Sequence, residues 1–144
     1  MNEQKRKHLP IGYWLKRADE LLTKQIDEAQ QANGLTRLAW QILNVIKQGE
    51  KVQSNEIINT LSPFADATVV QGTLAELTRQ DLISRVLEDR FDLTPAGAKL
   101  YEKALLPQQA IRQQAIAGIS EHEYVTTIAV LQQLVENLEN LDAT

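Results

Sequence analysis

The 144-residue sequence contains no cysteine and only two histidines. The lack of cysteine excludes disulfides, cysteine-ligated zinc, iron–sulfur clusters and thiol nucleophiles. His8 and His122 lie far apart in the sequence, so we expect no metal site. A glycine-rich phosphate loop and a nucleophile elbow are also lacking, and the carboxylates are spread over helix caps and solvated faces. We therefore expect no enzyme and no cofactor.

Long apolar runs are lacking as well. No stretch approaches the ~18 apolar residues of a membrane span, and the first ten residues lack the apolar centre of a secretory signal. We expect a cytoplasmic protein without a membrane partner. The net charge of −4 provides no general attraction for a polyanion, so any nucleic-acid binding must depend on a local arrangement of charge.

Glycine and proline are scarce, at 6 and 4 residues, and aromatic residues make up only 5% of the chain, which favours a mostly helical protein. Apolar residues recur every three or four positions over residues 9–32, and this spacing predicts a long amphipathic helix. Asn33 and Gly34 both tolerate the left-handed conformation that closes a helix, so we expect the helix to end there.

Three further helices are predicted, each preceded by a polar residue that can cap its first turn. Thr36 would cap a helix ending near Gly49, Ser54 a short helix reaching Leu61, and Asp66 a fourth helix. The inward face of that fourth helix would carry apolar residues at steps of three and four: Ala67, Val70, Leu74 and Leu77.

The apolar period then changes from helical to extended. Residues 84–87 and 90–93 predict a short β-hairpin. A helix restarts at Pro95, because proline suits the first helical position, and we expect Pro107 to kink or split it.

The last helix has the clearest start signal, since Ser120 and Glu123 have the spacing of a capping box. An apolar stripe at heptad-like intervals comes after it: Tyr124, Leu131, Leu134, Leu138 and Leu141. Such a stripe can pack on its own chain, but together with the long first helix it favours a symmetric homodimer.

This order of elements describes a helix-turn-helix with a wing, flanked by helices from both termini. Five stretches carry a family resemblance: Ile11-Gly12-Tyr13-Trp14-Leu15, Gly34-Leu35-Thr36 with Trp40-Gln41-Ile42-Leu43, Leu74 through Leu77 to Leu82-Ile83, Leu93-Thr94-Pro95-Ala96-Gly97, and Gly118 to Glu123. With these, the chain resembles the MarR family of winged-helix transcription regulators over nearly its whole length.

The resemblance implies a mainly α fold: a winged helix-turn-helix with a short β-hairpin wing, flanked by long N- and C-terminal dimerisation helices. It implies one domain over residues 1–144, with dimerisation helices at 9–32 and 95–142 and the winged helix-turn-helix at 35–94. It also implies a homodimer that binds a pseudo-palindromic operator in double-stranded DNA. The implied role is repression, relieved by a small aromatic or phenolic effector.

An alternative function also fits the residues. Between Lys51 and Arg90 the chain has four basic and six acidic residues, a poor balance for attracting DNA. The same fold could therefore serve a dimeric ligand-sensing or protein-interaction module with weakened DNA binding.

The helix after Asp66 leaves polar side chains outward, where they can read base edges. The residue at the position where family members commonly have arginine is Gly72, and the wing is shorter than the family's. The alternative for all these candidates is an ordinary solvated surface. The candidate DNA contacts are Ser54, Thr68, Gln71, Arg79, Arg85 and Arg90.

An effector pocket is expected where the dimer helices meet the winged domain. An arginine beside aromatic rings can hold a carboxylate or phenolate, which makes Tyr13, Trp14, Arg17 and Trp40 the candidates. The alternative is that both tryptophans belong to the core, as is common at helical spacing.

Overall fold

The computed structural model describes residues 2–143 of the chain. The chain divides into two compact units, with the boundary between Gln109 and Ala110. The elements of the first unit succeed one another as α1 (Glu3–Arg6), α2 (Ile11–Gln30), the 3-10 turn η1 (Gln31–Asn33), α3 (Arg37–Gly49), β1 (Val52–Gln53), α4 (Ser54–Thr60), α5 (Ala67–Arg79), β2 (Ile83–Arg85) and β3 (Arg90–Leu93). Helix α6 (Pro95–Ala115) runs across the boundary, and α7 (Glu121–Asp142) lies in the second unit.

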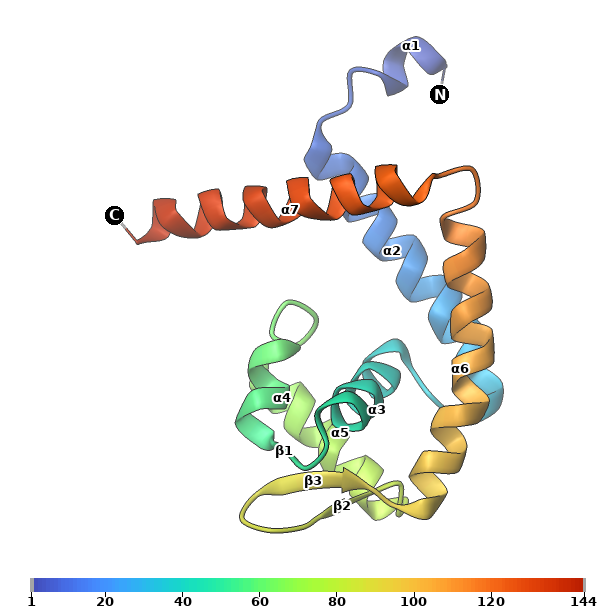
Figure 1. Ribbon diagram of the computed structural model, residues 1–144, viewed down its shortest axis with the longest axis vertical. Coiled ribbons are helices and arrows are strands. Elements are labelled where there is room, and N and C mark those ends of the chain that lie inside the picture. Colours follow the sequence, from blue (N-terminus) through green and yellow to red (C-terminus); the bar gives the residue numbers. More distant parts are fainter. Residues whose placement is uncertain (1, 144) are drawn as a thin grey trace. The chain divides into compact units, whose positions relative to one another are not determined.

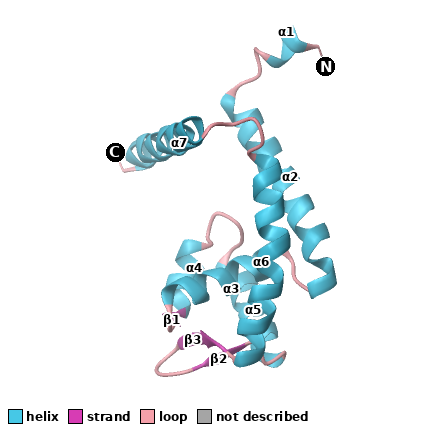
Figure 2. Cartoon of the chain, turned by 45° about the vertical axis from the view of Figure 1, so that its right-hand side comes forward, coloured by secondary structure: helices cyan, strands magenta, loops and turns pink. Residues whose placement is uncertain are grey.

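The strands form one antiparallel sheet of order β1-β3-β2 (Figure 1). In its register Ile83 lies opposite Leu93, and Val52 lies opposite Phe91. Figure 2 shows the strands gathered beside α4 and α5, with β2 and β3 forming the hairpin. The mainly α winged helix-turn-helix predicted from the sequence is therefore confirmed, and β1 is an additional strand that the sequence did not predict.

Two of the helix caps predicted in this part of the chain are present, and one is not. The Thr36 hydroxyl accepts from the Ala39 amide at 3.1 Å and the Asp66 carboxylate accepts from the Val69 amide at 3.0 Å, as predicted. Gly34 ends η1 with a φ of 69°, also as predicted. Ser54 is not a cap: it is the first residue of α4, and its hydroxyl bonds to the side chain of Asp89.

Two smaller predictions are wrong, and a third is contradicted in part. Ala67 is exposed, because only the later residues of the inward face reach the core. The first hairpin strand is Ile83–Arg85 rather than 84–87. The next residue, Val86, belongs to the turn, where its amide donates to the Arg90 carbonyl at 2.7 Å. Of the two outcomes expected at Pro107, a kink or a split, the split does not occur, because α6 is continuous through this residue.

The core of the first unit lies among α3, α4, α5 and the sheet. Ile42, Leu43 and Ile46 of α3 are fully buried there, and Val70 of α5 joins them. Trp40 stacks on Tyr101 of α6 with ring centroids 5.0 Å apart. This packing holds α5 by one face, because burial of apolar side chains is the main force that fixes a short helix in place.

Polar contacts from Gln30 and to Arg37 tie α2 to the rest of the first unit. The buried Gln30 amide donates to the Ala104 carbonyl at 2.8 Å. At the start of α3, the Arg37 guanidinium donates to the Asp19 carboxylate at 2.8 Å and lies 4.9 Å from the Phe64 ring in the loop before α5. The long first helix is thus joined to the segment that precedes α5.

Within residues 2–143, no helix combines the length and the apolar character of a membrane-spanning segment.

Candidate nucleic-acid interface

Helix α5 has a buried and an exposed face. Val70, Leu74 and Leu77 are buried, which fixes the rotation of the helix about its axis. The opposite face is exposed and carries Thr68, Gln71, Gly72, Ala75 and Arg79. A Cβ atom added at Gly72 would meet nothing within 4 Å, so this stretch of helix backbone is uncovered. Hydroxyl, amide and guanidinium groups are therefore presented outward on one helical surface.

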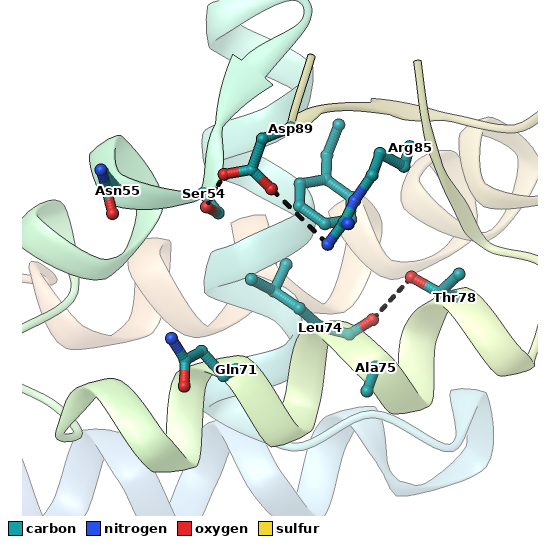
Figure 3. A pocket seen from close by; sticks show the side chains of 9 residues that line it. Ser54, Asn55, Gln71, Leu74, Ala75, Thr78, Arg85 and Asp89 are labelled. Atoms are coloured by element: carbon teal, nitrogen blue, oxygen red, sulfur yellow. Dashed lines mark hydrogen bonds and ion pairs between the residues drawn. The ribbon is translucent and has the colours of Figure 1, made fainter. Parts of the chain in front are cut away.

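An open groove of about 690 Å³ runs between α5, the start of α4 and the hairpin (Figure 3). Its α5 side is formed by Gln71, Leu74, Ala75 and Thr78, and its other side comes from α4 and the hairpin. The residues contributed from that other side are Ser54, Asn55, Arg85, Asp89 and Phe91.

The carboxylate of Asp89 makes the central polar contacts in this groove. The Ser54 hydroxyl donates to one of its oxygens, and the Arg85 guanidinium lies 3.5 Å from the other. The carbonyl of Asp89 also accepts from the Ser54 amide at 3.2 Å. Glu88 and Asp89 both have positive φ, at 39° and 62°, which lets the chain turn back into β3.

The other two arginines predicted to contact DNA are also engaged. Arg79 donates through Nε to Glu76 at 2.9 Å and through Nη2 to the second oxygen of the same carboxylate. These hydrogen bonds, together with a weaker contribution from Gln80, lower the pKa of Glu76 to about 2, and the Glu76 carboxylate raises the pKa of Arg79. Arg90 donates to the carbonyl of Lys51 at 2.9 Å.

The groove brings together Ser54, Gln71 and Arg85 from the predicted DNA contacts. Thr68 and Arg79 share the exposed face of α5 beside it, while Arg90 reaches back toward the turn before β1. Asn55 and Asp89 also line the groove, although neither was predicted as a contact. Asp89 meets Ser54 across 35 positions of sequence, and no local spacing pattern signals such a contact.

The four effector candidates fall into two environments. Tyr13 and Trp14 are partly exposed on α2 and pack edge to face with centroids 5.0 Å apart. Arg17 lies on the same helix and pairs with Glu20 at 3.7 Å. Trp40 is only 6% exposed and belongs to the core through its stack on Tyr101. The described residues contain no cluster of three or more histidine, cysteine or acidic side chains placed to hold a metal ion.

The comparisons with known proteins agree with this architecture. Residues 35–97 match the family described as winged helix DNA-binding domain. None of the curated proteins matches the sequence of the chain.

Solved structures of low sequence identity share the fold over most of their length. The S. aureus MepR–DNA complex is 20% identical with a TM-score of 0.79, and the match covers 90% of this chain and 96% of MepR. The reduced form of MarR from E. coli is 18% identical with a TM-score of 0.75, covering 92% and 98%. CouR from Rhodococcus jostii RHA1, bound to p-coumaroyl-CoA, is 21% identical with a TM-score of 0.77, covering 87% and 91%.

Proposed function

We propose that the chain, which has the fold of MarR-type DNA-binding transcriptional regulators, is a homodimeric regulator that binds a pseudo-palindromic operator in double-stranded DNA. The observation that carries the proposal is the exposed polar face of α5 beside an open groove bounded by the hairpin. A helix presented in this way can enter the major groove while the hairpin approaches the adjacent backbone.

The residue types on α5 suit direct reading of bases. The Gln71 amide can form two hydrogen bonds with one adenine, and the Ala75 methyl group can contact the methyl group of thymine. Thr68, at the start of the helix, can bond a base edge or a phosphate. Arg79, Arg85 and Arg90 would contact phosphates or the minor groove, which requires exchanging their present partners for DNA.

The homodimer is supported by apolar surface that is exposed within one chain. None of the described residues of α7 is buried, although Val130 and Leu138 are among its large apolar side chains. On α2, Ile11 and Leu15 are similarly exposed. A two-fold dimer would cover such surfaces and place two copies of α5 about one helical turn of DNA apart, ~34 Å.

We place the regulatory ligand at Tyr13, Trp14 and Arg17, where a small aromatic or phenolic effector would relieve repression. The support is the partly exposed Tyr13–Trp14 pair, with Arg17 less than one helical turn further along α2, together with the p-coumaroyl-CoA bound by the similarly folded CouR. Trp40 would act from the core, through its stack on Tyr101, rather than by touching the ligand.

A second function is favoured by one specific observation. Arg79 and Arg85 are each paired with a carboxylate, and the segment from Lys51 to Arg90 has more acidic than basic residues. A ligand-sensing or protein-interaction module that has kept the fold and lost much of its DNA affinity would show the same features.

Electrophoretic retardation of the DNA upstream of the protein's own gene, at low and moderate salt, separates the two functions. We expect a specific complex that weakens as salt rises, because phosphate contacts release counterions. Gln71→Ala should weaken it by roughly 1–3 kcal/mol per lost base contact. Gln113→Ala, an exposed glutamine of α6 outside the groove, is the control and should leave binding unchanged. Lack of specific retardation at micromolar protein in both salts would favour the module.

The effector is tested on the same complex with p-coumarate as the probe. We expect p-coumarate to dissociate the DNA complex and to change the tryptophan fluorescence of the protein. Trp14→Phe should abolish most of the fluorescence change, since Trp40 is enclosed in the core. A complex that is insensitive to phenolic acids would refute the effector but leave DNA binding intact.

A further inference from the structure

The contacts around Asp89 have the chemistry of an anion site. Its two carboxylate oxygens meet a hydroxyl donor from Ser54 and a cationic donor from Arg85 (Figure 3). Arg85 is also held by an aromatic contact, because its guanidinium lies 5.3 Å from the ring of Phe91, which is buried. A phosphate group offers the same acceptor oxygens as a carboxylate and is bound by the same donors.

The carboxylate can leave these donors without undocking the hairpin. The Ser54 amide bonds to the Asp89 carbonyl, so the backbone contact between α4 and the turn does not depend on the side chain. The side chains of Arg85 and Asp89 are 64% and 52% exposed. An ion pair that is so open to water is weak and is readily exchanged for another anion.

The position of the site relates it to DNA. Ser54, Arg85 and Asp89 line the same groove as Gln71, whose side chain lies on the facing helix. Phosphates border the major groove of DNA into which a recognition helix inserts. When Gln71 of α5 contacts a base, a backbone phosphate is therefore brought toward the side of the protein groove that carries Ser54 and Arg85.

We propose that the Ser54 hydroxyl and the Arg85 guanidinium form a phosphate-binding site that the Asp89 carboxylate occupies in the DNA-free protein, and that a backbone phosphate of duplex DNA displaces this carboxylate. The proposal rests on the proposed function, since it concerns the same interface. The Asp89 carboxylate then competes with DNA phosphate for Ser54 and Arg85. The protein therefore binds DNA less tightly than it would without this carboxylate.

Asp89→Asn is the direct test. Asparagine accepts a positive φ and keeps an oxygen that can accept from Ser54, but it removes the charge that holds Arg85. We expect about tenfold tighter binding of the operator duplex at low salt, with a gain that shrinks as salt is raised. Asp89→Gly, which also tolerates a φ of 62° and removes the carboxylate altogether, should give a similar gain.

Glu88→Gln is the matched control. Glu88 is the neighbouring residue of the same turn and also has positive φ, but its carboxylate has no hydrogen bond or ion pair among the described residues. It should change binding by less than about threefold, because it removes the same charge without freeing Ser54 or Arg85.

A second background separates competition from a general effect of charge. In an Arg85→Ala protein, Asp89→Asn should lose most of its advantage and fall to the level of Glu88→Gln. If Asp89→Asn tightens binding equally in the Arg85→Ala background, the phosphate site is overturned. It is also overturned if the wild type binds DNA but neither Asp89→Asn nor Asp89→Gly binds more tightly. Both outcomes leave the proposed function intact. Absence of binding by every variant would instead overturn the proposed function, and binding by Asp89→Asn without binding by wild type would support the competitor in its strongest form.

Discussion

The winged helix region, residues 35–94, is built mainly of helices, and α7 is a single long helix. Only the winged helix region encloses a hydrophobic core of its own. Residues of α3, α4, α5 and the sheet enclose side chains such as Ile42, Ile57 and Ile83 that are at most 1% exposed. Helix α7 is longer than any of these helices, yet none of its described residues is buried. Since burial provides most of the stability of a helix in a protein, α7 needs a packing surface that its own unit does not supply.

The difference is not in the starts of the helices. Helix α5 begins with an Asp66 cap, and α7 begins with a complete capping box in which Ser120 and Glu123 bond to each other's backbone. Local sequence therefore determines where both helices begin. Beyond the first turn the two helices differ, because the apolar row of α5 is buried and that of α7 is not.

The largest effect should come from truncating the core of the winged helix region. Ile42→Ala removes a fully buried side chain, and we expect the free energy of unfolding to fall by about 2–5 kcal/mol through lost burial and the cavity that remains. Urea unfolding monitored by circular dichroism measures it. Val69→Ala, on an aliphatic residue that is 49% exposed in α5, is the control and should cost less than about 0.5 kcal/mol. Equal losses in the two variants would show that this region has no distinct core.

The next effect addresses α7. Leu138 is 54% exposed and borders a shallow apolar depression with Val130 and Leu134. If the homodimer covers this surface, Leu138→Asp should weaken dimerisation by about 2–3 kcal/mol, because each protomer loses a buried leucine and gains a charge. Sedimentation velocity over a concentration series measures the dissociation constant. Glu139→Ala, on the adjacent exposed position, is the control, and a wild-type chain that is monomeric at tens of micromolar would contradict the prediction.

The third effect lies where α6 leaves the winged helix region. A Cβ atom at Gly97 would lie 1.8 Å from the Leu82 carbonyl oxygen, which also accepts from the Thr94 amide. Gly97→Ala should therefore cost about 1–3 kcal/mol, because α6 and the segment before β2 must move apart. Gly72→Ala, where a Cβ meets open space, should instead stabilise the protein by up to about 1 kcal/mol. Thermal unfolding of the two variants should shift in opposite directions, and a shared direction would refute the close packing.

The parts of the fold that the sequence predicted are those set by neighbours in the chain. The caps at Thr36, Asp66 and Ser120 act over three residues, and the turn at Gly34 needs one backbone conformation. Periodicity located the inward face of α5 from Val70 onward, since buried residues recur once per turn.

The parts that it could not predict depend on distant partners. Ser54 has the residue type of a cap, but its hydroxyl is taken by Asp89 from the hairpin. Strand β1 is only two residues long and exists through its pairing with β3, so it leaves no period of its own. The centre of the candidate site was missed for the same reason, because the Asp89 carboxylate accepts from Ser54, which lies 35 positions away in the sequence.

The smallest effect concerns two exposed carboxylates, one in each region. Hydrogen bonds from Arg79 and then Gln80 lower the pKa of Glu76 to about 2. The backbone amide of Ser120, and to a lesser extent its hydroxyl, lowers the pKa of Glu123. A carboxyl group whose pKa is lowered in the folded state stabilises the protein fully at pH values above its ordinary pKa of 4.5. For Glu76 this contribution is lost as the pH falls through about 2. Because both groups are exposed, the effect on unfolding should be small in each region.

The pKa values themselves can be measured by recording the NMR shifts of the side-chain carboxyl carbons as the pH is lowered. Arg79→Gln should return the pKa of Glu76 toward 4.5 and leave Glu123 unaffected, since each shift arises within one helical turn. Ser120→Ala should raise the pKa of Glu123 only in part, because the backbone amide remains as a donor. If Arg79→Gln leaves the pKa of Glu76 near 2, its shift does not come from the neighbouring guanidinium. If both responses hold, the two regions share the same local electrostatics and differ only in what they bury.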